Sequence, residues 1–229
     1  VGLLQLASGN DLTQVTSDGF SSQERVKALG WGLEKTLGES LTIAAIYDRD
    51  YHCDEEIATI LSQLRSQIRF AHIHARKELE NYLLVPNVLQ RALDREISDR
   101  QKRNGSPIIV NETIERLLLR LSQPTKARLF GRYSAQRSRH FEKSQYDDAT
   151  ITEQTMDWFE SRWSNIATRM EIVAGKELLK SVRDELQQTF GVSLTDHRII
   201  DAFRVEEIPT DLVDLLQGLD RLRGRSTSS

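Results

Sequence analysis

The chain has 229 residues, of which 38% are hydrophobic and 28% are charged, and its formal net charge is −3. This near balance of charge excludes a general polycation, so any contact with nucleic acid must come from a local basic patch. The single cysteine excludes an internal disulfide and no apolar run is as long as a membrane span, so we expect a cytoplasmic protein without membrane contact.

The pattern of the first 85 residues predicts an α/β fold. Short strands are expected over 2–7, 41–47 and 67–74, and amphipathic helices over 22–37 and 54–66. Strands joined by helical crossovers form parallel sheets that helices cover on both faces. Ligands of such sheets bind beyond the carboxyl ends of the strands.

The rest of the chain has mainly helical patterns. Helices are predicted over 86–99, 110–122, 125–143, 151–168, 175–189, 195–203 and 209–222, with a short strand over 170–173. We therefore predict an α/β core over 1–85, a helical insertion over 86–168, and a strand with helices over 169–229 that completes the domain. The chain opens with Val in a strand-like segment, so we expect it to be part of a longer protein.

Two aspartates follow the predicted strand over 41–47. Asp48 and Asp50 are two residues apart, and such residues point to the same side of an extended chain. Two anions held so close repel each other unless a cation lies between them, and hard oxygen ligands suit Mg²⁺ or Mn²⁺. The pair predicts a divalent-metal site that acts on phosphate. A lone Asp-x-Asp motif is nevertheless a weak signal.

Two glutamates follow the third predicted strand. Glu80 is expected at the same carboxyl edge of the sheet as the aspartates, where it would supply a third carboxylate. Glu78 would point the same way if its segment is extended. The alternative is that both are solvated charges at the start of a helix.

The segment over 173–177 reads as a strand-to-helix turn with a lysine at its mouth. It lacks the Walker A pattern, since Met170 replaces a required glycine and Glu177 replaces Ser or Thr. Lys176 could still lie beside a phosphate, helped by the helix N-terminus. A Gly-Lys pair at a helix start is also common without such a role.

The predicted helix over 125–143 is strongly basic. Its cationic side chains are interleaved with aromatic ones and predict a face that contacts DNA phosphates, through Lys126, Arg128, Arg132, Arg137 and Arg139. A charge run of this kind can equally be a solvated helix surface.

Three pieces of the chain together resemble one known family. In chain order they are Asp48-Arg49-Asp50-Tyr51, the segment from Glu78 to Pro86, and Gly175-Lys176-Glu177. They resemble the C-terminal Toprim nuclease domain of the overcoming-lysogenization-defect (OLD) family, over residues 2–220 or so. The resemblance implies a Toprim-like parallel sheet flanked by helices, with a helical insertion and a helical C-terminal part.

The resemblance also implies a function, that of a metal-dependent DNA endonuclease joined to an N-terminal ABC-type ATPase domain in the intact protein. Asp48, Asp50 and Glu80, and with them Glu78, match the metal-binding acids, and Glu80 and Lys176 are the expected catalytic residues. The implied cofactors are Mg²⁺ or Mn²⁺, as two ions, with ATP bound only by the ATPase domain. The implied partner is DNA, and we expect a homo-oligomer. The glutamate that ends the first Toprim strand is expected upstream of this chain, which would then hold part of an active site.

Two other classes of function stay open. Haloacid-dehalogenase phosphatases and nucleotide-sugar glycosyltransferases also use an Asp-x-Asp motif, so another magnesium-dependent phosphotransfer enzyme is one alternative. The phosphatases carry Thr or Val where this chain has His52. The helical remainder offers surface for dimerisation, so a non-catalytic assembly or regulatory module is the other.

Overall fold

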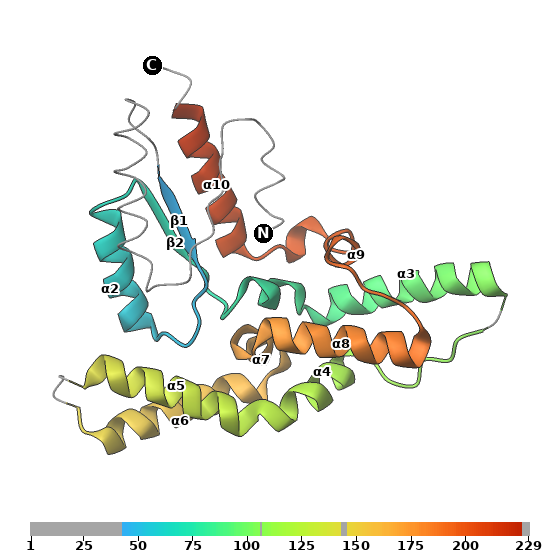
Figure 1. Cartoon of the computed structure of the whole chain (residues 1–229), viewed down its shortest axis with the longest axis horizontal. Coiled ribbons are helices and arrows are strands. Elements are labelled where there is room, and N and C mark those ends of the chain that lie inside the picture. The colour runs from blue at the N-terminus through green and yellow to red at the C-terminus, as the bar shows by residue number, and fades with distance from the viewer. Residues whose placement is uncertain (1–42, 106, 143–145, 226–229) are drawn as a thin grey trace. The chain divides into compact units, whose positions relative to one another are not determined.

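The structure is a computed structural model that describes residues 43–105, 107–142 and 146–225 (Figure 1). It shows an α/β protein that is mostly helical, with a two-stranded parallel sheet in its described part. The strand predicted over 2–7 and the helix predicted over 22–37 lie outside the described residues. Within those residues, no helix has both the length and the apolar character needed to cross a membrane.

Contacts divide the chain into two compact units, each assembled from separate stretches. The described part of the first, here called the sheet unit, comprises residues 43–47, 60–73 and 211–225. The second, the helical unit, comprises the described residues of 48–59 and 74–210. These boundaries differ from the three-part division predicted above, which stays a prediction. All of the predicted site residues fall within the helical unit.

The sheet unit contains β1 (Ala44–Tyr47) and β2 (Phe70–Ile73), which pair in parallel from Ala44 opposite Phe70 to Tyr47 opposite Ile73. Alternate residues of each strand are buried, as expected for a strand with one covered face. The connection between the strands contains α2 (Asp54–Arg65), whose acidic first turn suits a helix N-terminus. The parallel pair confirms the strand predictions for this part of the chain.

The long helix α10 (Thr210–Arg225) packs beside the sheet (Figure 1). Its Gly218 faces the ring of Phe70, and a Cβ atom at this position would come within 2.4 Å of that ring. Glycine therefore permits the close approach of helix and strand. The packing buries Leu212, Leu215 and Leu219.

In its described part, the helical unit contains seven α-helices, a 3-10 helix that carries Glu80, and two further 3-10 turns at Gln123–Thr125 and Val205–Glu207. The 3-10 helix is η3 (Leu79–Leu83), and the α-helices are α3 (Pro86–Asn104), α4 (Ile114–Ser122), α5 (Lys126–Phe141), α6 (Asp148–Ser164), α7 (Ile166–Ile172), α8 (Gly175–Phe190) and α9 (Asp196–Ile200). Helices α5 and α6 lie side by side as a hairpin, and α4 packs on α3 and α8 (Figure 1). Their apolar faces meet in one core that includes Leu89, Leu118, Phe159 and Val182.

Two predicted elements differ from the structure. The single helix expected over 151–168 is divided at Asn165, whose backbone is extended, into the end of α6 and the start of α7. The strand expected over 170–173 is the last turn of α7 and the residue that follows it. A helix forms there because the Asn165 side chain accepts hydrogen bonds from the backbone N–H groups of Ala167 and Thr168, which caps α7. The apolar residues Met170 and Val173 are three apart and both buried, which suits a helix end as well as a strand.

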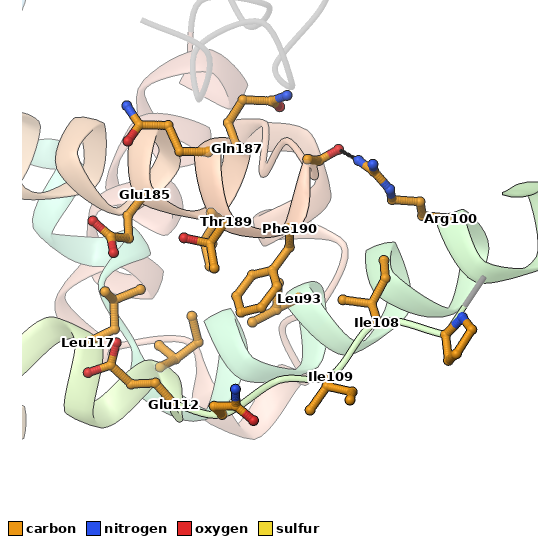
Figure 2. A pocket seen from close by; sticks show the side chains of 16 residues that line it. Leu93, Arg100, Ile108, Ile109, Glu112, Leu117, Glu185, Gln187, Thr189 and Phe190 are labelled. Atoms are coloured by element: carbon orange, nitrogen blue, oxygen red, sulfur yellow. Dashed lines mark hydrogen bonds between the residues drawn. The ribbon is translucent and has the colours of Figure 1, made fainter.

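A cavity of about 530 Å³ lies between α3, the 107–112 segment and the C-terminal end of α8 (Figure 2). Leu93, Ile108 and Phe190 form part of its apolar wall, and Arg100 and Glu112 lie at its edge. No residue predicted to bind metal, phosphate or DNA lines it. The candidate site must therefore be sought elsewhere in the helical unit.

Candidate functional site

The two aspartates lie in a tight turn directly after β1. Asp50 has a left-handed backbone with φ of 51°, a conformation that is uncommon outside glycine but tolerated by Asp. Its N–H donates to the carbonyl oxygen of Lys77 at 2.8 Å, and Asp48 Oδ1 accepts from the N–H of Leu79 at 3.0 Å. Both aspartates are therefore held against the segment that carries the two glutamates.

The pKa of the Asp48 carboxyl group is shifted by its surroundings. Although the residue is exposed, the surrounding chain displaces water from its carboxyl group, and this desolvation raises the pKa of Asp48 to about 6. The hydrogen bond from Leu79 works against the rise. Smaller contributions that raise it come from the charges of Asp50, Glu80 and Glu78. Negative charge is thus concentrated at this turn, residues 48–51, which is called the acidic turn below.

Glu78 is engaged in contacts that hold the fold. Its Oε1 pairs with the ammonium group of Lys77, and its Oε2 accepts the N–H of Lys176 at 2.9 Å. The second contact joins the 74–84 segment to the N-terminus of α8, where a carboxylate is favoured by the helix dipole. Glu80, on η3, has no hydrogen bond or ion pair to any described residue and is half-buried. Of the two glutamates, Glu80 is the better placed to bind a ligand.

Lys176 is the second residue of α8 and lies next to Glu78 through its backbone. Its side chain is exposed, and within the described residues its ammonium group pairs with no acid. The strand-to-helix turn predicted here is instead a helix-to-helix junction.

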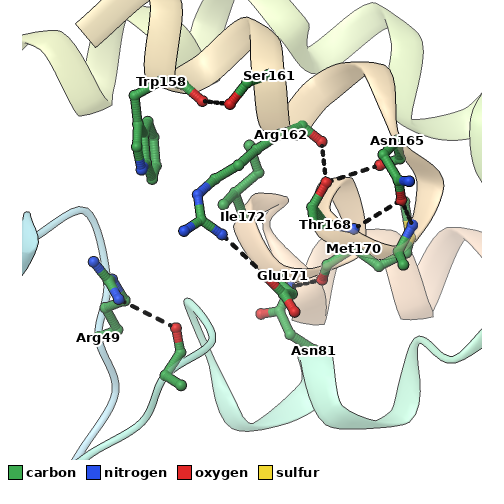
Figure 3. Close-up of polar contacts among 12 residues, drawn as sticks. Arg49, Asn81, Trp158, Ser161, Arg162, Asn165, Thr168, Met170, Glu171 and Ile172 are labelled. Carbon is green, nitrogen blue, oxygen red and sulfur yellow. Dashed lines mark hydrogen bonds and ion pairs between the residues drawn. The ribbon is translucent and has the colours of Figure 1, made fainter. Parts of the chain in front are cut away.

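Asn81 is a central residue of the site that sequence reasoning missed. Its fully buried side-chain amide donates to the carbonyl oxygen of Met170 at 2.7 Å (Figure 3) and to that of Val173 at 3.0 Å. Its Oδ1 accepts from the N–H of Glu78 at 2.8 Å. One side chain thus fastens the acidic segment to the end of α7 and the start of α8. The sequence gave no sign of this role, because an Asn beside acidic residues is equally expected to be exposed to solvent.

Gly175 allows this fastening, because a Cβ atom there would lie 2.5 Å from Asn81 Oδ1. We expect Gly175→Ala to lower the free energy of unfolding by about 2 kcal/mol, through overpacking against a buried amide. Gly131→Ala is the matched control, since a Cβ atom at that position in α5 meets nothing within 4 Å. It should raise stability by about 0.5–1 kcal/mol, the gain in helix propensity. Urea denaturation measures both, and an unchanged Gly175→Ala protein would contradict the close contact.

Lys77 is the second residue that the sequence gave no reason to single out. Its side chain is only 3% exposed, and its ammonium group lies 4.5 Å from the ring centroid of Tyr51 while it pairs with Glu78. Its N–H donates to the carbonyl oxygen of Glu171 at 2.9 Å, and Glu171 in turn pairs with Arg162 (Figure 3). A buried cation therefore lies directly behind the acidic turn.

Most of the basic side chains of α5 that were predicted to contact DNA already interact with other residues of the protein. Three of its five predicted DNA contacts are paired with acids of other helices: Lys126 with Glu160, Arg128 with Glu177, and Arg137 with Glu55. Arg139 donates to a carbonyl of its own helix, and Arg132 lies over the ring of Tyr51. Much of the positive charge of α5 is thus balanced within the helical unit.

Comparison with known proteins adds no relative. No family model, no curated protein and no solved structure matches the chain. The Toprim resemblance therefore stays a prediction, and the site is judged on its own contacts.

The donor set fits a hard divalent cation in kind. Asp48, Asp50 and Glu80 supply oxygen ligands and concentrated negative charge, which Mg²⁺ and Mn²⁺ prefer. Within the described residues, however, no three acidic, His or Cys side chains converge closely enough to hold an ion as they stand. The described chain thus supplies carboxylates of the right type without a complete coordination geometry.

Proposed function

We propose that this chain is the nuclease part of an ATPase-coupled, metal-dependent DNA endonuclease with a Toprim-like fold. The observation that supports the proposal most is that backbone hydrogen bonds hold Asp48 and Asp50 against the segment that carries Glu78 and Glu80. Like charges gathered on one tight turn are stabilised by a bound cation. The left-handed backbone of Asp50 is a second support, since strained residues cluster at functional sites.

In this proposal Asp48, Asp50 and Glu80 hold the metal, and an upstream glutamate completes the set. Two bound ions would supply an activated water and stabilise the leaving oxygen of phosphodiester hydrolysis. Lys176 balances the charge of the reacting phosphate from the start of α8, which is a preorganised electrostatic role. Glu78 positions that helix start through its bond to the Lys176 N–H.

The test is the nicking of supercoiled plasmid with Mg²⁺ or Mn²⁺, by protein extended upstream of the first residue. We expect Asp50→Asn to reduce nicking by about 100-fold or more, the scale of losing one key electrostatic group, and to bind DNA as the parent protein does. Asn keeps the size of Asp and tolerates a left-handed backbone, so a loss of activity would not reflect misfolding. Asp157→Asn, at an exposed position on α6, is the control and should cleave normally.

The outcomes separate the three readings. Nicking that disappears in Asp50→Asn and in EDTA supports the nuclease. Turnover of small phosphoesters without any dependence on DNA would favour another phosphotransfer enzyme. No cleavage by the extended protein, together with an oligomer that EDTA leaves intact, would favour the assembly or regulatory module.

A further inference from the structure

A phosphate that reaches the acidic turn needs a cation beside it, because its own charge is repelled by Asp48 and Asp50. Most cations near the turn are already engaged. Lys77 pairs with Glu78, Arg49 pairs with Asp54, and the paired residues of α5 were described above. A phosphate at the turn therefore needs a nearby cation that pairs with no acid.

Among the described residues, Lys176 at the start of α8 is one cation without an ion pair, and Arg132 on α5 is a second. The Arg132 side chain is exposed, and its guanidinium carbon lies 5.9 Å from the ring centroid of Tyr51, the residue directly after Asp50. None of the acids among the described residues forms an ion pair with it. Its charge contributes, after those of Arg128 and Lys77, to a lowered pKa of Glu177, so its field reaches the start of α8.

The position of Arg132 relative to the turn is fixed by packing. The ring of Tyr51 meets that of Tyr133 edge-on, with centroids 5.0 Å apart, and Tyr133 is buried and donates to the carbonyl oxygen of Ile172 at 2.9 Å. Three residues further along α5, Gln136 Nε2 lies 3.2 Å from the Nδ1 atom of His52. These contacts hold α5 against the turn and keep Arg132 beside Tyr51.

We infer that Arg132 is the residue of α5 that binds the DNA phosphate at the acidic turn, an inference that rests on the proposed nuclease function. A guanidinium group binds a phosphate through two parallel N–H bonds, and a neighbouring aromatic face keeps it in place. Such a contact positions the DNA backbone without reading its sequence. The paired residues Lys126, Arg128 and Arg137 then serve mainly to hold α5 to its neighbours.

The experiment measures the affinity of the upstream-extended protein for a fluorescent DNA duplex by anisotropy, in EDTA and over a range of salt. Arg132→Ala should weaken binding about tenfold and lower the salt slope by about one, the loss of one phosphate contact. Arg132→Lys keeps the charge without the paired N–H bonds, so it should retain the slope and weaken binding less. Arg103→Ala is the control, since Arg103 is exposed on α3 and, among the described residues, hydrogen-bonds only to a carbonyl of its own helix.

Arg139→Ala decides between a specific contact and a diffuse basic surface. Arg139 is exposed on the same helix, about 10 Å further along its axis, and pairs with no acid among the described residues. A loss as large as that of Arg132→Ala would overturn the inference, as would wild-type affinity in Arg132→Ala or no DNA binding by the parent protein. Cleavage plays no part in this measurement, so an intact plasmid would refute the nuclease function without deciding the role of Arg132.

Discussion

Asn81→Ala is expected to lower the free energy of unfolding by about 3 kcal/mol, the largest loss of stability that we predict for one side chain. The variant leaves the carbonyl oxygens of Met170 and Val173 and the N–H of Glu78 without their partner. Buried backbone groups that lose a partner retain the full cost of their desolvation. In a chain of this size, such a loss lowers the melting temperature by about 10 °C.

Two further variants show that the hydrogen bonds are the cause. Asn81→Asp keeps the shape and one acceptor but replaces the two N–H donors by an oxygen facing two carbonyl oxygens, so it should be at least as unstable as Asn81→Ala. Asn87→Ala changes an exposed residue in the first turn of α3 and should shift stability by less than about 0.5 kcal/mol. Thermal unfolding followed by circular dichroism measures all three. An Asn81→Asp protein of parental stability would disprove the role of the donors.

Local periodicity was enough to predict most helices and the two described strands. Apolar residues at helical spacing marked α2, and a generally helical pattern marked α3, α5, α8 and α10. The pairing of β1 with β2 followed from the helical crossover between them. The 170–173 segment was assigned wrongly because four residues are too few for a period to show. The capping side chain of Asn165, five residues earlier, decides that segment.

The sequence could predict the candidate site only where a residue's position follows from its place at the carboxyl end of a strand. Asp48 and Asp50 follow a strand, so their place at its carboxyl end could be read from the sequence. The roles of Asn81, Lys77 and Gly175 depend on contacts between segments about a hundred residues apart, such as the one from Glu78 to the start of α8. No local pattern records such contacts. The ion pairs that neutralise α5 are hidden for the same reason.

The other large effect concerns Asp48, where function and stability should change in opposite directions. Asp48→Asn should reduce metal-dependent nicking by about 100-fold or more, as for Asp50→Asn. The amide oxygen can still accept the hydrogen bond from Leu79, while the charge that desolvation and Asp50 disfavour is removed. We therefore expect the metal-free variant to be more stable at neutral pH. Discounted for solvent screening at an exposed residue, the gain is about 1 kcal/mol, or a few degrees in melting temperature.

The gain should depend on pH in a defined direction. The pKa of Asp48 is about 6 in the folded chain against 3.8 ordinarily, so between these values the folded state binds more protons than the unfolded state. The wild-type chain therefore loses stability as the pH rises through about 6, whereas the Asn variant has no such group. The difference between the two proteins should be full above about pH 7 and vanish below about pH 4.

Melting curves in EDTA at several pH values, set beside the nicking assay, test both halves of this expectation. A variant that is less stable than wild type at neutral pH would make the Asp48 carboxylate a structural acceptor, which needs no metal. A variant that is more stable yet still cleaves would separate the acidic turn from catalysis. A carboxylate whose role is to bind a cation predicts both results together, a gain of stability and a loss of cleavage. Selection retains a charge that lowers stability only where function requires it.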